Sequence, residues 1–260
     1  MKRLLQRIFE SKAGHYIAFK GGTLSYFFLL DRQSQLVGLD ARVIPTTWET
    51  ASSTNYSRGE IADFESSSVH YLDRFSTDID LDLLDDNKEQ EVIQHLGDTL
   101  SSLGNVKDQK LGKFLHRRIF SYDEKGMNIK IELNKRIWKD NTYEAIPLDG
   151  IPIYCMTPDC IFANKLVALS DRFANRDLYD VYFFFTKKFP INHKVIKERT
   201  GLPIKKFIQK LTKALPSHFA ENTILAGLGE VLTDKQKIRV KKSLLDEVMK
   251  LLKKYNARVK

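Results

Sequence analysis

The segment that organises this chain reads Arg74-Phe75-Ser76-Thr77-Asp78-Ile79-Asp80-Leu81-Asp82. Successive side chains of a strand point to opposite faces, so the alternation predicts a strand with one apolar and one acidic face. The apolar face carries Thr77, Ile79 and Leu81, and the acidic face carries Ser76, Asp78, Asp80 and Asp82. Adjacent carboxylates repel one another and favour a cation. A hard divalent ion such as Mg²⁺ takes carboxylate and phosphate oxygens together. The alternative is a solvated acidic edge, because further acidic residues follow at 85–91.

The bulk composition is that of an ordinary globular protein. The chain has 260 residues, is 42% apolar and 29% charged, and has the length for one large or two modest domains. Its two cysteines, Cys155 and Cys160, are too few for a disulfide framework or a usual zinc site, so we expect a reduced, cytoplasmic environment. No apolar run approaches the ~18 residues of a membrane helix, and we expect no membrane partner.

The net charge of +9 is unevenly distributed. Residues 186–260 carry 19 Lys and Arg against 6 Asp and Glu, whereas the rest of the chain carries 23 against 27. An acidic front part joined to a basic back part suggests a metal-holding region beside a phosphate-binding or nucleic-acid-binding region. The alternative is a set of solvated, lysine-rich helices.

A second motif, Gly21-Gly22-Thr23, follows a predicted strand at 15–19 and precedes apolar residues at helical spacing. The free backbone N–H groups and the dipole of a helix N-terminus favour an anion there. By itself, however, a Gly-Gly pair is more often a turn.

A polar, Ser- and Thr-rich segment separates these two motifs. Its edges resemble each other: Leu30-Asp31-Arg32-Gln33-Ser34 opens it and Leu72-Asp73-Arg74-Phe75-Ser76 closes it. We therefore interpret residues 31–73 as an insertion between the glycine motif and the acidic strand.

The acidic strand is followed by a predicted helix at 91–103 and a predicted hairpin of strands at 114–122 and 127–134. If the second hairpin strand lies beside the acidic one, Glu132 points to the same face as Asp78 and Asp80 and completes a carboxylate cradle. The alternative is an exposed Glu132 that pairs with Lys130 or Arg118.

Thr157-Pro158 predicts the start of a helix that carries Lys165 on an apolar face. Such a lysine either extends its ammonium out to solvent or presents it to phosphate oxygens in a site. In the next predicted helix Asp177 and Asp180 share one face, and Arg176 precedes Asp180 by four residues, a spacing that by itself indicates a salt bridge within the helix. The remainder of the chain is predicted to be helical and basic.

Taken in order, five motifs resemble those of the AbiEii/AbiGii-type nucleotidyltransferases, a family that includes the MenT-type toxins. They are Gly21-Gly22-Thr23, Arg74 to Asp80, Lys130-Ile131-Glu132, Lys165 to Leu169 and Arg172 to Asp180. The resemblance implies an α+β fold, with a DNA polymerase β-like nucleotidyltransferase core and mixed sheet in residues 1–150. A C-terminal helical domain would follow in residues 151–260.

The resemblance also implies roles for individual residues. Asp78 and Asp80 would hold Mg²⁺, and Glu132 would be a third ligand or a base for the acceptor hydroxyl. The triphosphate would contact Gly21, Gly22, Thr23 and Ser76, with Arg74 assisting, and Lys165 would bind phosphate oxygens. Asp177 and Asp180 would give polar support, and Asp82 would be the solvated end of the strand.

The function expected from this resemblance is nucleotidyl transfer from an NTP to an acceptor, by the toxin of a toxin–antitoxin or phage-defence system. Its partners would be a tRNA acceptor and a cognate antitoxin protein, and the basic C-terminal helices suit an RNA acceptor. Two alternatives stay open: transfer to a small molecule such as an antibiotic, and a non-catalytic NTP-binding module.

Overall fold

The computed structural model describes residues 1–24, 78–124, 126–220, 223–228, 232 and 234–259. The insertion predicted at 31–73 lies outside these residues, and so do Arg74 and Ser76. Predictions about them stay predictions.

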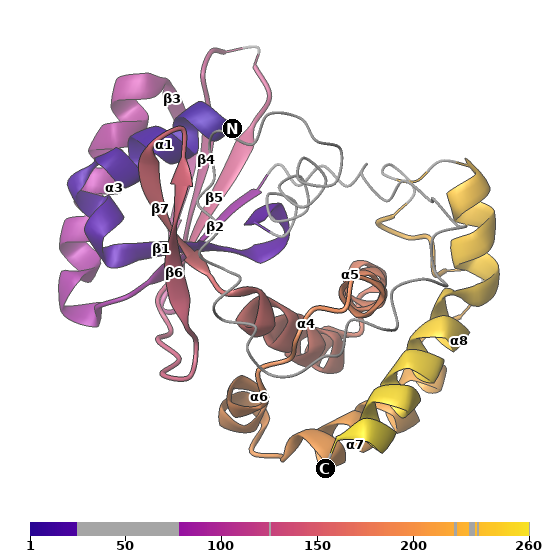
Figure 1. Cartoon of the computed structure of the whole chain (residues 1–260). Coiled ribbons are helices and arrows are strands. Elements are labelled where there is room, and N and C mark those ends of the chain that lie inside the picture. The colour runs from indigo at the N-terminus through magenta and orange to yellow at the C-terminus, as the bar shows by residue number, and fades with distance from the viewer. Residues whose placement is uncertain (25–77, 125, 221–222, 229–231, 233, 260) are drawn as a thin grey trace.

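Seven strands of the described chain form one mixed sheet in the order β3-β4-β5-β2-β1-β7-β6 (Figure 1). They are β1 Ile17–Lys20, β2 Asp78–Leu83, β3 Asn105–Leu111, β4 Leu115–Ser121, β5 Ile129–Asn134, β6 Tyr143–Leu148 and β7 Ile151–Met156. The acidic segment supplies the central strand, β2, which pairs antiparallel with β1 and parallel with β5. The predicted hairpin is the antiparallel pair β4 and β5. The mixed sheet with its helices confirms the α+β class.

The alternation in β2 decides how this strand packs. Ile79 and Leu81 are fully buried in the core. Helices α1 (Lys2–Glu10) and α3 (Glu89–Leu103) flank one side of the sheet, joined to their neighbouring strands by the short 3-10 turns Lys12–Tyr16 and Asp86–Lys88 (Figure 1). The predicted helix at 91–103 is α3, which buries Val92, Leu96 and Leu100.

Within the described residues, five helices follow the sheet and extend from its other side (Figure 1). They are α4 Pro158–Arg172, α5 Asn175–Thr186, α6 His193–Thr200, α7 Ile204–His218 and α8 Asp234–Arg258. Helix α4 begins at Pro158, as predicted. Helix α8 buries an apolar stripe that includes Leu244, Val248 and Leu252, and its lysines lie mostly on the exposed side.

The last strand of the sheet extends past the predicted boundary at residue 150. Strand β7 pairs with β6 through a tight turn at Asp149 and Gly150, both with positive φ, and ends at Met156. Residues 151–156 therefore belong to the sheet, whereas the expectation placed them in the helical part. The division into two domains stays a prediction. None of the helices within the described residues is long and apolar enough to cross a membrane.

Candidate active site

Three carboxylates lie on one face of the central sheet. Asp78 and Asp80 are on β2 and Glu132 is on β5, and the register pairs Asp80 with Glu132 and Asp78 with Lys130. Directly paired residues of neighbouring strands project to the same face. The side chains of Asp78 and Glu132 are 29% and 24% exposed, so ligands can reach them. The structure thus places Glu132 beside the acidic strand, as predicted.

The glycine motif lies directly against this face, although a long stretch of sequence separates the two. Strand β1 ends at Lys20, which is paired with Asp80, and the chain turns at Gly21 with φ 81°. A Cβ atom on residue 21 would lie 2.9 Å from the Cβ and Cγ atoms of Asp80 and closer still to its Oδ2. Thr23 is buried, and its hydroxyl donates a hydrogen bond to the carbonyl of Asp78 (2.5 Å). Residues 21–24 are helical, so this helix begins beside the carboxylates.

A lysine and two aspartates from α4 and α5 form a second charged group. The Lys165 Nζ lies 2.7 Å from Asp180 Oδ2 and 3.7 Å from Asp177 Oδ1. Arg172 donates two hydrogen bonds to Asp177, at 2.5 and 2.8 Å. These contacts depend on the turn at Phe173, whose left-handed conformation (φ 47°) ends α4 and lets α5 fold back against it. The aspartates therefore pair with α4, where the sequence suggested a salt bridge within their own helix.

The pKa of Asp177 shows that these contacts outweigh its burial. Burial alone would raise this pKa, but the hydrogen bonds from Arg172 and the charges of Lys165, Arg172 and Arg176 lower it below its ordinary value. Asp177 is therefore an ionised, fully buried carboxylate that fixes Lys165 and Arg172 in place.

The pKa of Asp80 depends both on the carboxylates of the sheet and on Lys165 of the second charged group. Burial raises the pKa of this carboxyl, the ammonium of Lys20 lowers it, the carboxylates of Glu132 and Asp78 raise it, and the ammonium of Lys165 lowers it. The net shift is upward. The ammonium of Lys165 on α4 is thus one of the charges that act on Asp80.

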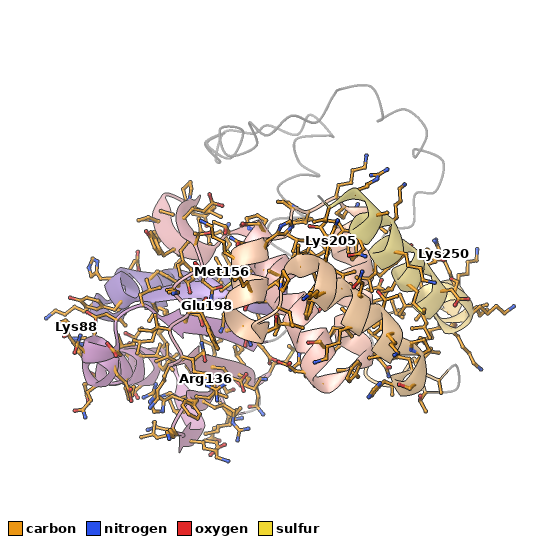
Figure 2. The ribbon with its side chains drawn as sticks, turned by 90° about the horizontal axis from the view of Figure 1, so that it is seen from below. Lys88, Arg136, Met156, Glu198, Lys205 and Lys250 are labelled. Carbon is orange, nitrogen blue, oxygen red and sulfur yellow. The ribbon has the colours of Figure 1, made fainter. Side chains whose placement is uncertain are left out.

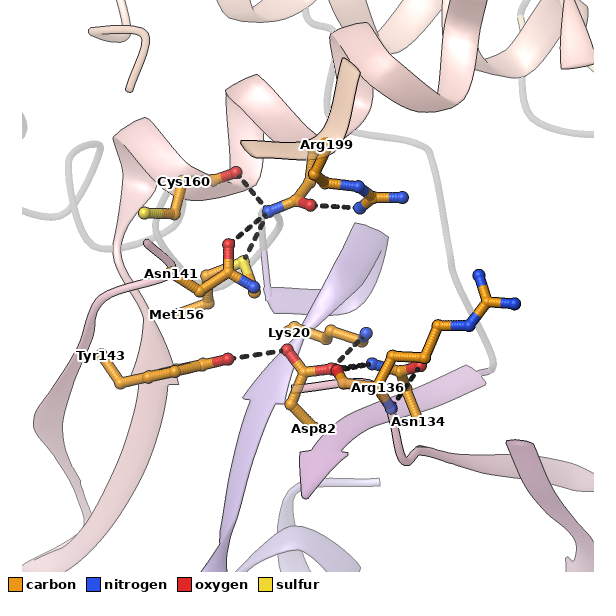
Figure 3. A network of polar contacts seen from close by, with 10 residues as sticks. Lys20, Asp82, Asn134, Arg136, Asn141, Tyr143, Met156, Cys160 and Arg199 are labelled. Carbon is orange, nitrogen blue, oxygen red and sulfur yellow. Dashed lines mark hydrogen bonds and ion pairs between the residues drawn. The ribbon is translucent and has the colours of Figure 1, made fainter. Parts of the chain in front are cut away.

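Asp82 is the site residue for which the sequence prediction is wrong. It was expected at the solvated end of the strand, but it is only 2% exposed. Its carboxylate accepts hydrogen bonds from Lys20, from Asn134 Nδ2 (2.7 Å) and from the Tyr143 hydroxyl (3.0 Å) (Figure 3). The alternation correctly gave the face of β2, but the side chains of Lys20, Asn134 and Tyr143 contact Asp82 on that face.

The carboxylate face fits a hard divalent cation by its chemistry. Within the described residues, no group of three or more His, Cys, Asp or Glu side chains is already gathered as a metal site. The cation near Asp78 and Glu132 is instead the ammonium of Lys130, at 2.9 and 3.4 Å. Oxygen donors suit Mg²⁺, and glycine at position 21 lets the chain pack directly against the Asp80 carboxylate. If Mg²⁺ binds here, Asp78, Asp80 and Glu132 would hold it.

Sequence reasoning gave no role to three cations of this site. Lys130 entered as an alternative partner of Glu132 and as part of a motif, Arg172 entered only as part of a motif, and Lys20 did not enter. The strand alternation did carry a signal for Lys130, which precedes Glu132 by two residues and so shares its face. The contact of Lys20 with Asp82 needed the pairing of β1 with β2.

The model of the AbiEii family, described as a nucleotidyl transferase toxin of type IV toxin–antitoxin systems, matches residues 67–220. This match spans more than half of the chain. The protein belongs to the AbiEii family. It is therefore a nucleotidyltransferase of a toxin family. The match contains Asp78, Asp80, Glu132, Lys165, Asp177 and Asp180, but it begins after Gly21–Thr23, whose place beside Asp80 comes from the tertiary structure.

Solved structures of low sequence identity are similar to this AbiEii-family chain. The crystal structure of JHP933 from Helicobacter pylori has a TM-score of 0.47 at 16% identity, over 99% of this chain and 92% of that one. The nucleotidyltransferase toxin MenT4 from Mycobacterium tuberculosis has a TM-score of 0.42 at 16% identity, over 93% of this chain and 79% of that one. No curated protein sequence matches the chain.

Proposed function

We propose that this protein transfers a nucleotidyl group from an NTP to a hydroxyl group of an RNA, with tRNA as the acceptor, in a reaction that depends on Mg²⁺. The observation that carries the proposal is the register of β2 and β5, which sets Asp80 beside Glu132 with Asp78 on the same face. A bound magnesium ion would neutralise the phosphate oxygens and the charge that develops during transfer.

The proposed reaction is a displacement at the α-phosphorus of the NTP. The acceptor hydroxyl oxygen forms a new bond to this phosphorus, the bond to the β-phosphate oxygen breaks, and pyrophosphate leaves. One oxygen of Glu132 would take the hydroxyl proton, while Asp78 and Asp80 would hold the magnesium ion that supplies positive charge at the phosphate group. Glu132 is suited to this task because its partly exposed carboxylate lies directly beside Asp80.

The triphosphate is proposed to lie between the glycine motif and α4. The backbone at Gly21 and Gly22 opens a helix beside Asp80, a position that favours phosphate oxygens. The charge of Lys165 on α4 acts on Asp80, and its ammonium would supply a positive charge for the pyrophosphate that leaves. Its contacts with Asp177 and Asp180 hold the ammonium in place.

An aromatic and basic strip beside the site supports a nucleic acid as acceptor. The strip consists of Phe114, Arg136, Trp138 and Arg199. The Arg136 guanidinium lies 4.0 Å from the ring centre of Phe114, and that of Arg199 lies 4.9 Å from the ring centre of Trp138. Flat guanidinium and aromatic groups stack with unpaired bases, and their charge attracts phosphates.

Strand β5 ends at Asn134, two residues after Glu132, and Arg136 of the strip follows two residues later. Asn134 bonds both to Asp82 and to the backbone of Arg136, so the strip starts from the same polar network (Figure 3). The backbone N–H groups of Lys139 and Asp140 donate to Glu198 on α6, at 2.9 and 3.1 Å. These bonds hold the loop that carries Trp138 in a fixed place. An RNA end on this strip would have its terminal hydroxyl close to Glu132.

The test of catalysis is to incubate the purified protein with Mg²⁺, each labelled NTP in turn, and a tRNA pool. We expect label to appear on tRNA with the unchanged protein and not with the Asp78→Asn/Asp80→Asn variant. Label on a small molecule with none on RNA would overturn the choice of acceptor. If no NTP labels any acceptor, the catalytic proposal is wrong.

We also propose that the protein acts as a toxin in a toxin–antitoxin or phage-defence system, countered by a cognate antitoxin protein. The family supports this role. Induced expression in a bacterial host should arrest growth, and co-expression of the protein encoded next to it should restore growth. The Asp80→Asn variant should not arrest growth. An equally toxic variant would contradict the link between toxicity and nucleotidyl transfer.

A further inference from the structure

Lys130 stands at the carboxylates where a metal ion is expected. Its Nζ lies 2.9 Å from Asp78 Oδ2 and 3.4 Å from Glu132 Oε2, and its side chain is 33% exposed. The backbone imposes this position, because Lys130 is paired directly with Asp78 and precedes Glu132 by two residues on the same strand. The contact therefore follows from the register of two central strands.

The Lys130 ammonium lies between two carboxylates, those of Asp78 and Glu132, and supplies a positive charge to this face of the sheet. In the metal-free protein this ammonium neutralises a face that otherwise gathers three carboxylates. Without it, their mutual repulsion would be larger.

A divalent ion on this face needs the same oxygens. Magnesium binds carboxylate oxygens at ~2.1 Å, so an ion held by Asp78 and Glu132 would lie within a few ångströms of the ammonium. Two cations that close repel one another strongly. Lys130 has a flexible four-carbon stem and can move its charge elsewhere. A triphosphate that arrives with the metal would offer the ammonium a new partner.

We propose that Lys130 is an exchangeable counter-ion. It neutralises Asp78 and Glu132 before the metal–nucleotide arrives, is displaced from them by the metal, and then binds an oxygen of the triphosphate chain. The inference rests on the proposed function, because it needs metal and triphosphate to bind at this face. Lys130 should therefore have two opposite effects on binding: it lowers the affinity for free metal and raises the affinity for metal-bound polyphosphate.

The experiment uses the Lys130→Met variant, which keeps the length of the side chain and removes its charge. Affinity for Mn²⁺ alone is measured by electron paramagnetic resonance, and affinity for inorganic tripolyphosphate with Mg²⁺ is measured by calorimetry. We expect Mn²⁺ to bind roughly tenfold more tightly and tripolyphosphate roughly tenfold more weakly than to the unchanged protein. Tripolyphosphate avoids any assumption about the preferred base.

Two further variants serve as controls. Lys135→Met removes a lysine that follows the same strand but pairs with Glu89 (2.8 Å), away from the carboxylate face, so both affinities should stay unchanged. Lys130→Arg keeps the charge and should keep Mn²⁺ affinity within about twofold of that of the unchanged protein. Melting curves without metal establish that each variant is folded.

The two outcomes of opposite sign separate this inference from simpler roles. A purely structural lysine would weaken both affinities, and a lysine that only binds phosphate would leave Mn²⁺ affinity unchanged; either result overturns the proposal. If the unchanged protein binds neither Mn²⁺ nor tripolyphosphate, the proposed function fails, and this inference fails with it. If it binds both but Lys130→Met binds Mn²⁺ no more tightly, this inference alone is wrong.

Discussion

Gly21 and Asp80 touch across the pairing of β1 with β2, although most of the stretch between them belongs to a segment that the structure does not describe. Residue 21 combines a positive φ of 81° with a place against the Asp80 side chain that leaves no room for a Cβ atom. Both requirements select glycine, the first by backbone conformation and the second by contact.

Replacing Gly21 with alanine should abolish transfer while costing little stability. We expect about 1 kcal/mol of destabilisation from the strained φ, and a loss of about a hundredfold in activity because the new methyl group displaces Asp80. Gly150→Ala is the matched control, since Gly150 has φ 83° but nothing within 4 Å of its Cβ position. Equal activity losses in the two variants would show that backbone strain, and not the contact with Asp80, is responsible.

Replacing Asp80 with asparagine should stabilise the metal-free protein while it inactivates the enzyme. The pKa of Asp80 is raised, mainly by burial, so its charged form costs stability above that pKa, and the cost disappears as the pH falls and the carboxyl is protonated. At pH 7 the melting temperature of the variant should be higher than that of the unchanged protein, and this difference should shrink toward pH 4. Calorimetric melts across this range, without metal, test the sign. A difference in melting temperature that grows as the pH falls would contradict the prediction.

Asp177 should show the opposite dependence on pH. Because the pKa of Asp177 is lowered in the folded protein, its ionised form stabilises the fold at pH values above the ordinary aspartate pKa. This stabilisation is lost as the pH falls through the lowered pKa of the folded protein. Asp177→Asn removes one partner of a buried ion pair and should cost about 3–5 kcal/mol at pH 7. The exposed Asp171→Asn on the preceding turn should cost less than about 0.5 kcal/mol. Urea unfolding at pH 7 and at a pH below the ordinary aspartate pKa of 3.8 measures both.

Asp82 should act through structure alone. Asp82→Ala leaves Lys20 and the Tyr143 hydroxyl without their buried acceptor, and we expect a loss of about 3–5 kcal/mol in the free energy of unfolding. The exposed Asp86→Ala in the same acidic stretch should be nearly neutral. Chemical denaturation gives both values. If Asp82→Ala is as stable as Asp86→Ala, the network in Figure 3 contributes little to stability.

The strip of Phe114, Arg136, Trp138 and Arg199 should bind RNA. Trp138→Ala should weaken binding of a labelled single-stranded RNA about tenfold to a hundredfold by removing a stacking surface. Mn²⁺ affinity should not change. Lys250→Ala is the control, because Lys250 lies at the opposite end of the molecule from Arg136 (Figure 2). Equal losses in both variants would indicate general attraction of RNA to a basic protein.

The sequence by itself determined the local features of this protein. The period of two in a strand put Ile79 and Leu81 in the core and Asp78 and Asp80 on the opposite face, because that alternation is fixed by backbone geometry. Thr157-Pro158 likewise fixed the start of α4. The order of the motifs was enough to indicate the AbiEii family, which the match over residues 67–220 confirms.

Only the tertiary structure decided what each polar side chain contacts. Asp80 and Asp82 follow the same alternation, yet Asp80 lies beside Glu132 and Gly21, whereas Asp82 is buried under Tyr143. Strand pairing, the left-handed turn at Phe173 and the loop before β6 bring together residues far apart in the sequence. Local periodicity gives the face on which a residue lies, but burial and electrostatic environment depend on which other segments cover that face.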